Sequence, residues 1–475
     1  MQDPSIFVGE GLPVAFSSIS FLFCFLPLFF IIYYLIPARA KNVVLLAGSL
    51  FFYAWGEPRW ILLLLASILV TWLLGRAMRP ETGAGRRRGL LILGLVFQLG
   101  LLVAVKYAGF FFGAFIDLPK LHLPLGVSFY TFHAISYLVD VYRQKTPPQK
   151  NLLRLGLYLA LFPKLVMGPI VPYHELEPAL AQRTIDAQDV SDGCFRFTIG
   201  LAKKALLADA LAGLVTGIWG DLASLTVLSA WLGLIGYALQ LYFDFSGYSD
   251  MAIGLGRMLG FRFPENFRYP YLCSSISDFW RRWHISLGSW FKEYLYFPLG
   301  GSRAGTLRTL RNLLLVWLAT GLWHGASWNY VLWGLYFGVL ICLEKLLAPR
   351  FRAHPRKGLL AGLYRPVCLL LAVLGWVLFR AEDLPAAGRY FACLFGGAAG
   401  ASAQARLYLH DFWPVLLLGA VGATPLCAKL AGRLGAKLQP RVRAAVQAVL
   451  VLALLACSTV WLLNGSFQSF VYFQF

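Results

Sequence analysis

The stretch FLFCFLPLFFIIYYLIP, residues 21–37, contains no charged side chain and decides the class of fold. A helix of about 20 apolar residues spans the hydrocarbon core of a bilayer, and this stretch is close to that length. The residues before it, MQDPSIFVGEGLP (1–13), contain no Lys or Arg, whereas a signal peptide begins with a basic leader. We therefore predict that the apolar run at 17–37, which contains this stretch, is retained in the protein as a membrane helix.

Similar apolar runs recur along the whole chain. Of its 475 residues, 59% are hydrophobic and 13% are charged, and the mean hydropathy is +0.66, which is too apolar for a soluble core alone. We find no internal repeat and expect one all-α integral-membrane domain over residues 1–475, with about ten to thirteen helices, some of them short or broken. The further runs lie at 42–55, 59–75, 89–105, 152–171, 226–243, 310–324, 328–347, 366–379, 411–429 and 444–463.

Basic residues are distributed unevenly around these runs. Lys and Arg are enriched in cytoplasmic loops, and the first run is followed, but not preceded, by basic residues. This pattern predicts an N-terminus outside the cytoplasm. The basic stretches 79–88, 350–357 and 433–443 are predicted to be cytoplasmic, so the last run leads outward and residues 465–475 form an extracytoplasmic tail.

The net charge of +20 has two interpretations. It could indicate a polyanionic partner, but most of the basic residues lie in short loops beside apolar runs. Positive-inside topology in a bilayer with anionic lipids accounts for that distribution, and we expect no nucleic-acid partner. A cytoplasmic site for an anionic donor such as coenzyme A is compatible with it. The eight cysteines are scattered and form no CxxC pair, so we expect neither a disulfide framework nor a metal site.

The segment SSISDFWRRWHISLGSWFKEYLY, residues 274–296, is too polar to span a membrane against lipid. Charged side chains at membrane depth usually face protein or a water-filled cavity. Ser277 followed by Asp278 resembles the start of a helix. We therefore predict an interior or interfacial helix that lines a cavity, with Arg281, Arg282, His284 and Lys292 as its polar residues.

Two of the seven histidines, His284 and His324, lie among polar and aromatic residues within apolar surroundings. Such a histidine is a candidate for function, although a buried histidine bonded to a neighbouring helix is the structural alternative. Acyl transfer to a hydroxyl needs a base and a group that stabilises the oxyanion, and two imidazoles can supply both. The small residues Gly325 and Ala326 beside His324 would admit a substrate or, equally, a close helix crossing.

Two carboxylates, Asp244 and Asp250, interrupt an apolar stretch at 242–256. The Gly and Ser residues between them suggest a broken helix. Asp244 is predicted either to orient a histidine or to form an ion pair with Arg281 or Arg282. The glycines of the same stretch lack the spacing and the preceding strand of a dinucleotide site.

The chain ends in the aromatic string NGSFQSFVYFQF, residues 464–475. An aromatic belt at the membrane interface is one interpretation of this composition. The alternative is that the tail folds back into the protein and presents the hydroxyl of Tyr472 to the site. With a pKa near 10, that hydroxyl would need a base beside it to act as a nucleophile.

Several strings together resemble the membrane-bound O-acyltransferase family, and within it the alginate O-acetyltransferase branch. The family's hallmark histidine falls on His324, and its second polar position falls on His284. His133 departs from the pattern, because Glu or Gln is usual at its position. The matching strings are LPLGVSFYTFHAISYLVDVYR (123–143), FPKLVMGPI (162–170), LYFDFSGYSDMAIGLGRMLGF (241–261), PENFRYPY (264–271), SISDFWRRWHISLGSWFKEYLYFPLGG (275–301) and GLWHGASWNYVLWG (321–334).

The resemblance implies a helical fold around a central tunnel in a bacterial cytoplasmic membrane, with His324 and His284 as catalytic residues. The donor would be acetyl-CoA or an acyl carrier-protein thioester, with no permanently bound cofactor. The tail resembles an aromatic motif that receives the acyl group, so a Tyr472 ester would pass it to an extracytoplasmic SGNH or serine hydrolase-like acetyltransferase that modifies an envelope polymer such as alginate. The expected substrate-binding residues are Asp244, Asp250, Asn266, Trp280, Arg281, Arg282, Trp283 and Trp323.

Two alternatives remain open at this point. An enzyme of the same family could act on a lipid, a protein or, with D-alanine, on teichoic acid, but the aromatic tail disfavours these acceptors. A transporter could use the same histidines and carboxylates as a proton relay, but transporters often contain paired repeats and this chain shows none.

Overall fold

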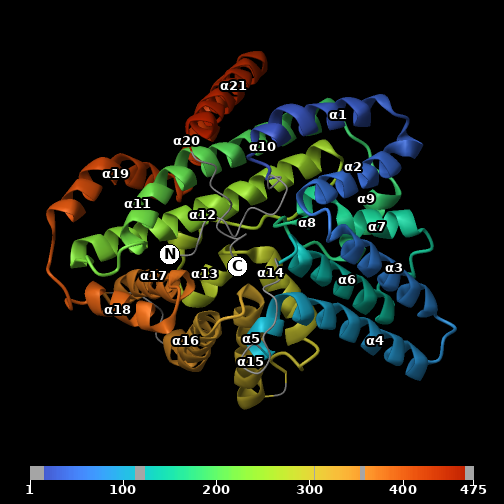
Figure 1. The fold of residues 1–475 in the computed structure, drawn as a ribbon, viewed down its shortest axis with the longest axis horizontal. Coiled ribbons are helices and arrows are strands. Elements are labelled where there is room, and N and C mark those ends of the chain that lie inside the picture. Colours follow the sequence, from blue (N-terminus) through green and yellow to red (C-terminus); the bar gives the residue numbers. More distant parts are fainter. Residues whose placement is uncertain (1–14, 113–122, 304, 354–358, 466–475) are drawn as a thin grey trace. The chain divides into compact units, whose positions relative to one another are not determined.

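The computed structural model describes residues 15–112, 123–303, 305–353 and 359–465, and all regular structure in these ranges is helical (Figure 1). This confirms the predicted all-α class. The described residues form two compact units. Unit 1 takes those within 15–198, 248–264 and 459–465, and unit 2 takes those within 199–247 and 265–458.

Unit 1 is organised around α6 (Val127–Tyr142), most of whose side chains are buried. Close packing against α6 depends on glycines on the neighbouring helices. A Cβ on Gly75 would lie 2.5 Å from Tyr137, and one on Gly94 would lie 2.6 Å from Leu138. The remaining helices of this unit are η2 (Phe21–Phe25), α1 (Leu26–Leu35), η3 (Ala38–Ala40), α2 (Lys41–Gly56), α3 (Ile61–Ala77), α4 (Ala84–Leu102), η4 (Val103–Tyr107), α5 (Ala108–Phe112), α7 (Leu152–Ala160), α8 (Phe162–Leu165), α9 (Tyr173–Ala181), most of α10 (Ala187–Ala202) and the C-terminal ends of α12 (Val227–Met258) and α21 (Pro440–Asn464).

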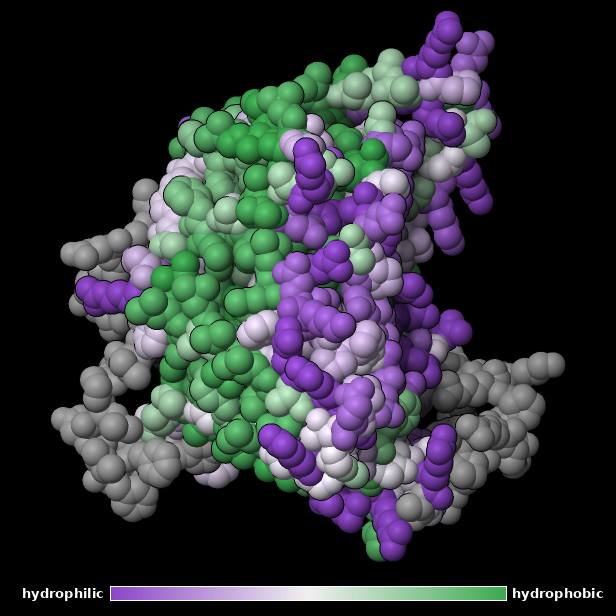
Figure 2. All heavy atoms as spheres, turned by 90° about the vertical axis from the view of Figure 1, so that its right-hand side faces the viewer, coloured by the Kyte–Doolittle hydropathy of each residue, from purple (hydrophilic) through white to green (hydrophobic). Residues whose placement is uncertain are grey.

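Hydrophobic side chains also cover the outside of unit 1. Leu62 on α3 and Val96 on α4 are 72% and 62% exposed. Figure 2 shows hydrophobic side chains merged into one broad area, with hydrophilic side chains gathered along its side. A continuous apolar area of this kind is unfavourable in water and suits contact with lipid.

The apolar runs of the sequence become helices of unequal length. Within the described residues, five helices are long and apolar enough to cross a bilayer, or six if the bent pair α19 and α20 forms one broken span. Phe21–Leu35, which holds most of the apolar stretch at residues 21–37, and Ile61–Ala77 are shorter apolar helices. The sequence predicts such short and broken segments. The five long helices are Ala84–Phe110, Val227–Met258, Trp328–Leu347, Gly362–Arg380 and Pro440–Asn464.

Unit 2 contains a tight helical hairpin, α15 (Thr306–His324) followed by α16 (Trp328–Ala353). Glycines bring the two helices together, since a Cβ on Gly321 would lie 2.3 Å from the carbonyl oxygen of Tyr330. The other helices with residues in unit 2 are η5 (Lys203–Ala208), α11 (Asp209–Trp219), α12 (Val227–Met258), η6 (Pro270–Leu272), α13 (Ile276–Arg282), α14 (Ile285–Phe291), η7 (Lys292–Tyr296), α17 (Leu359–Arg380), α18 (Leu384–Leu394), α19 (Ala403–Gly422), α20 (Leu426–Gly435) and α21 (Pro440–Asn464).

α12 corrects one prediction. The sequence suggests a broken helix within 242–256, but α12 runs without interruption from Val227 to Met258. The glycines serve helix packing instead, because a Cβ on Gly247 would lie 2.7 Å from the carbonyl oxygen of Gly200 on α10. Glycine in this helix therefore permits a close crossing and does not mark a break.

The start of α13 corrects a second prediction. The side chain of Ser275, and not that of Ser277, caps the helix by accepting a hydrogen bond of 3.0 Å from the backbone of Asp278. Ser275 has the extended backbone that an N-cap requires. The hydroxyl of Ser277 instead donates to Glu344 on α16 at 2.6 Å.

Candidate active site

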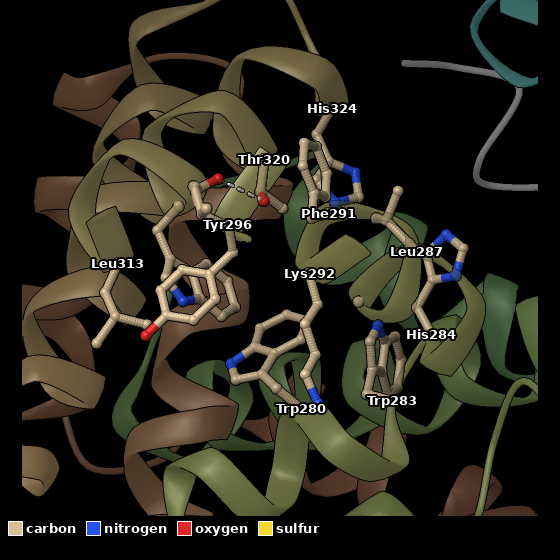
Figure 3. Close-up of a pocket in the computed structure, with 13 residues that line it drawn as sticks. Trp280, Trp283, His284, Leu287, Phe291, Lys292, Tyr296, Leu313, Thr320 and His324 are labelled. Atoms are coloured by element: carbon tan, nitrogen blue, oxygen red, sulfur yellow. Dashed lines mark hydrogen bonds between the residues drawn. The ribbon is translucent and has the colours of Figure 1, made fainter. Parts of the chain in front are cut away.

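A cavity of about 270 Å³ in unit 2 is lined by both candidate histidines (Figure 3). α13 and the residue after it contribute two tryptophans, α14 and η7 form one wall, and α15 forms another. None of the described lining residues is Asp or Glu, so the polar groups of the site are its two imidazoles, one lysine, two hydroxyl groups and the indole N–H groups of three tryptophans. The cavity is lined by Trp280, Trp283, His284, Leu287, Gly288, Phe291, Lys292, Tyr296, Leu313, Val316, Trp317, Thr320 and His324.

His324 is the last residue of α15 and is 4% exposed. Aromatic rings surround its imidazole, with ring centroids 4.9 Å away for Trp333 and 5.1 Å away for Phe379. The backbone turns away at Gly325, where a Cβ would lie 2.2 Å from the ring of Tyr330. Gly325 therefore allows α16 to pack closely beside His324. Of the two predicted roles for this small residue, a close helix crossing or access for a substrate, the structure shows the first.

His284 lies between α13 and α14 in a left-handed backbone conformation with φ of 45°. Few residues other than glycine adopt this conformation, so the neighbouring contacts must hold it in place. The backbone N–H of Ile285 donates to the carbonyl oxygen of Asn266 at 3.0 Å. Its imidazole packs edge-on against Phe245, with ring centroids 4.6 Å apart.

Asn266 defines the tautomer of His284. Its Oδ1 accepts from the backbone N–H of Ser286 at 3.1 Å and from the hydroxyl of Ser286 at 3.0 Å, so this atom is an oxygen. His284 Nδ1, which lies 3.2 Å from the same oxygen, is therefore its N–H donor, and Nε2 carries the lone pair. Burial lowers the pKa of His284 to about 3, so the imidazole is neutral at ordinary pH.

The cavity brings several predicted residues together. Trp280 and Trp283 line it beside both histidines, and Figure 3 shows the two imidazoles on the same side of the cavity with Leu287 between them. Trp323 is 6% exposed and does not line the cavity, but its ring lies 4.9 Å from that of His324 and 6.1 Å from that of His284. It therefore packs between the two histidines.

Other predicted residues lie apart from the cavity. Asp244 accepts from Lys204 at 2.7 Å, and the same ammonium lies 2.7 Å from Asp209, with all three side chains buried. The predicted partners of Asp244, Arg281 and Arg282, both pair with Asp278 instead.

The side chain of Arg281 is 72% exposed, which directs it away from the buried histidines. Asp250, in unit 1, pairs with Arg196 at 2.6 Å. Tyr472 lies outside the described residues.

Sequence reasoning missed the walls of the cavity. Leu313, Trp317, Thr320 and His324 recur at helical spacing and place one stripe of α15 on the cavity. Lys204 was also missed, although a lysine inside an apolar run five residues before Asp209 is a signal for a buried ion pair.

The fold and the cavity define a class of protein: a multi-pass helical membrane protein with two buried histidines in one site. The chain belongs to the membrane-bound O-acyltransferase family, which it matches over residues 50–361. It is thus a membrane O-acyltransferase, and its relatives place it in the alginate O-acetylase branch of the family.

Two relatives resemble the chain over most of its length. The probable alginate O-acetylase of Pseudomonas aeruginosa is 43% identical over 396 residues, which is 80% of this chain and 75% of the relative. The peptidoglycan O-acetyltransferase of Helicobacter pylori is 36% identical over 413 residues, 78% of each. The teichoic acid D-alanyltransferase of Bacillus subtilis is more distant, at 29% identity over 48% of this chain and 62% of the relative.

Proposed function

We propose that the protein takes an acetyl group from a cytoplasmic thioester, acetyl-CoA or an acyl carrier-protein, and delivers it for O-acetylation of an envelope polysaccharide. The observation that carries the proposal is that His284 and His324 line the same apolar cavity. An apolar site strengthens electrostatic interactions and keeps the thioester away from water. Further support comes from relatives described as alginate O-acetylases and a peptidoglycan O-acetyltransferase.

The chemistry divides between the two imidazoles. His324 takes the proton of the acceptor hydroxyl as its oxygen attacks the thioester carbonyl, and the carbonyl π electrons move onto oxygen. When the tetrahedral intermediate collapses, the C–S bond breaks and the thiolate takes the proton from His324. The products are an ester and a free thiol. His284 is neutral with its N–H directed to Asn266, so it contributes a lone pair at Nε2 and helps to orient the reacting groups.

The first acceptor in this scheme is the hydroxyl of Tyr472. The acetyl ester on the tail then passes to an extracytoplasmic SGNH or serine hydrolase-like acetyltransferase, which acetylates the polymer. Predicted topology supports this order, because both the tail and the polymer would lie outside the cytoplasm of a bacterial inner membrane.

The test uses purified protein in liposomes supplied with acetyl-CoA labelled in the acetyl group. We expect the wild type to release coenzyme A and carry label on its C-terminal peptide. His324→Ala should lower the rate of thiol release by about 10²-fold or more, the usual contribution of a general base. His410→Ala is the matched control, because His410 is exposed on α19 outside the cavity and should leave the rate unchanged.

Tyr472→Phe separates the relay from the transferase activity. The relay predicts that this variant carries no label on its C-terminal peptide and does not acetylate polymer in membranes that contain the partner enzyme. Wild-type polymer acetylation by Tyr472→Phe, together with loss of activity in His324→Ala, would remove the tyrosine ester from the mechanism. A wild type that releases no thiol from any thioester donor would contradict the proposed function.

A further inference from the structure

Each of two walls of the cavity starts at one of the two histidines. One wall begins at His284 and continues through Leu287 and Phe291 to Tyr296, and the other runs back along α15 from His324 to Leu313. Both walls therefore lead from a histidine toward the same far end. At 1.5 Å per residue, the α15 wall is about 16 Å long.

The far end is where η7 meets the first half of α15. The side-chain amide of Asn312 donates to the carbonyl oxygens of Leu299 and Gly301, both at 3.0 Å, so the turn after η7 is attached to α15 at this level. In Figure 3, Tyr296 lies beside Leu313, and the amino group of Lys292 points away from His324.

Among the described residues that line the cavity, Lys292 is the one with a cationic side chain. Its side chain is exposed, and its ammonium lies 5.6 Å from the centre of the Phe297 ring. No carboxylate of the described residues lies within 4 Å of it. A single ammonium that points away from His324 in an otherwise apolar lining, with no Asp or Glu among the described lining residues, is suited to an anion.

Basic residues on the same side indicate which compartment this end faces. Arg308 and Arg311 are exposed on the first turns of α15, and α15 begins on the same side as the C-terminal end of α16, because the two helices form a hairpin. Arg350 and Arg352 belong to the last turn of α16. By the positive-inside rule this end of the cavity faces the cytoplasm, where a thioester donor would enter.

We propose that Lys292 binds the phosphate that a pantetheine thioester carries at the end of its arm, while the thioester itself lies at the two histidines. This inference rests on the proposed function and names the part of the donor that the site recognises. The apolar stripe between the two ends contacts the uncharged arm. Coenzyme A and a carrier protein both supply such a phosphate, so the recognised group is common to the two sources.

The experiment compares donors with and without the phosphate. Purified enzyme in liposomes is assayed for thiol release with acetyl-CoA, with an acetyl-loaded carrier protein and with S-acetylpantetheine, which has the same arm and no phosphate. The phosphate-bearing donor that the wild type uses with the lower KM is the source. With that donor, Lys292→Gln should raise KM about tenfold, the effect of losing one charge-assisted hydrogen bond, with kcat unchanged. With S-acetylpantetheine, KM should stay the same.

Two further variants sharpen the comparison. Lys292→Arg keeps the charge and should restore most of the affinity for the phosphate-bearing donor. Arg308→Gln removes a neighbouring charge that does not line the cavity, and its KM should equal that of the wild type.

Three outcomes would overturn the inference. An equal rise of KM for all donors in Lys292→Gln would mean that the lysine only packs in the wall. An equal effect of Arg308→Gln would mean that general surface charge attracts the donor. A wild type that prefers S-acetylpantetheine would mean that the phosphate is not recognised. Failure of the proposed function is distinguishable from these, because no donor would then release thiol from the wild type.

Discussion

At the scale of single residues, the site depends on one amide oxygen. Asn266 is fully buried, and its Oδ1 accepts from His284 Nδ1 and twice from Ser286. This oxygen holds the imidazole in one tautomer and connects the left-handed turn at His284 to the start of α14. A residue that does not line the cavity thus determines which nitrogen of His284 carries the proton.

Replacing Asn266 by alanine should therefore impair both stability and rate. Three donors would lose their acceptor, and each stranded buried donor costs about 1–3 kcal/mol of unfolding free energy. The imidazole would lose its orientation, which we expect to lower kcat by about 10²-fold. Thermal denaturation in detergent and thiol release measure the two effects.

Ser286→Ala is the matched control for this prediction. It removes one donor to the same oxygen, the hydroxyl, but leaves the backbone N–H and the acceptor in place, so its loss of stability should stay below about 1 kcal/mol. Equal behaviour of the two variants would show that the amide oxygen does not position His284.

The burial of His284 also predicts a pH dependence of stability. The pKa of His284 is about 3 in the folded protein and near the ordinary 6.5 in the unfolded chain. Between these values the unfolded state binds the proton and the folded state does not, so stability falls as the pH drops below 6.5. The loss should reach about 2 kcal/mol at pH 5.

The contribution of His284 to this pH dependence can be measured by comparing the wild type with a variant that lacks the imidazole. Unfolding of the wild type and of His284→Gln is compared at pH 7 and pH 5, and the variant should lose about 2 kcal/mol less on acidification. His410→Gln, at an exposed position, should behave as the wild type. If His284→Gln keeps the full acid sensitivity, another group is responsible for it.

At the scale of elements, α13 is held by a carboxylate from another helix. Glu344 on α16 accepts from the backbone N–H groups of Ile276 and Ser277 at 2.6 and 2.9 Å, and the hydroxyl of Tyr364 donates to it at 2.5 Å. Free N–H groups and the helix dipole both favour an anion at a helix start. Since α13 leads directly into His284, this contact determines the position of one wall of the site.

Glu344→Gln should therefore reduce activity without any contact with substrate. The amide can accept fewer of these hydrogen bonds and carries no charge, which should cost about 1.5–3 kcal/mol of stability. A small shift of α13 should lower kcat by at least tenfold. Glu382→Gln, at an exposed glutamate before α18, is the control and should leave both quantities unchanged. Wild-type kcat in Glu344→Gln would show that α13 is positioned by its other contacts.

At the scale of the whole molecule, patterns among neighbouring residues in the sequence predicted more of the structure than attempts to pair distant side chains did. The apolar runs predicted the helical membrane class, and the two histidines in polar surroundings line one cavity as neighbours. Partners distant in sequence could not be predicted: Asp244 and Lys204 are 40 residues apart, and Glu344 and Ile276 are 68 apart. The prediction of a broken α12 failed because a glycine that permits a close crossing looks the same in sequence as one that ends a helix.

The orientation of unit 2 in the membrane follows from its own contacts. The backbone N–H of Val227 at the start of α12 donates to the carbonyl oxygen of Ala399 at 3.0 Å, so the loops before α12 and before α19 lie on one side. The side chain of Asn329 similarly connects the start of α16 to Ala381 at the end of α17, at 2.6 Å. The first turns of α15, which carry Arg308 and Arg311, and the C-terminal end of α16 lie at the opposite end of the helical hairpin.

Cysteine labelling should reveal this arrangement. In a variant without the eight native cysteines, we expect Ala223→Cys and Ala401→Cys, both at exposed positions, to react with a membrane-impermeant maleimide in intact cells. Arg308→Cys should react only after the membrane is opened, because the positive-inside rule places the start of α15 in the cytoplasm. The reverse labelling pattern would mean that unit 2 has the opposite orientation in the membrane and that the donor end of the cavity faces outward. Different behaviour of the first two positions would instead contradict the packing of α12 beside the loop before α19.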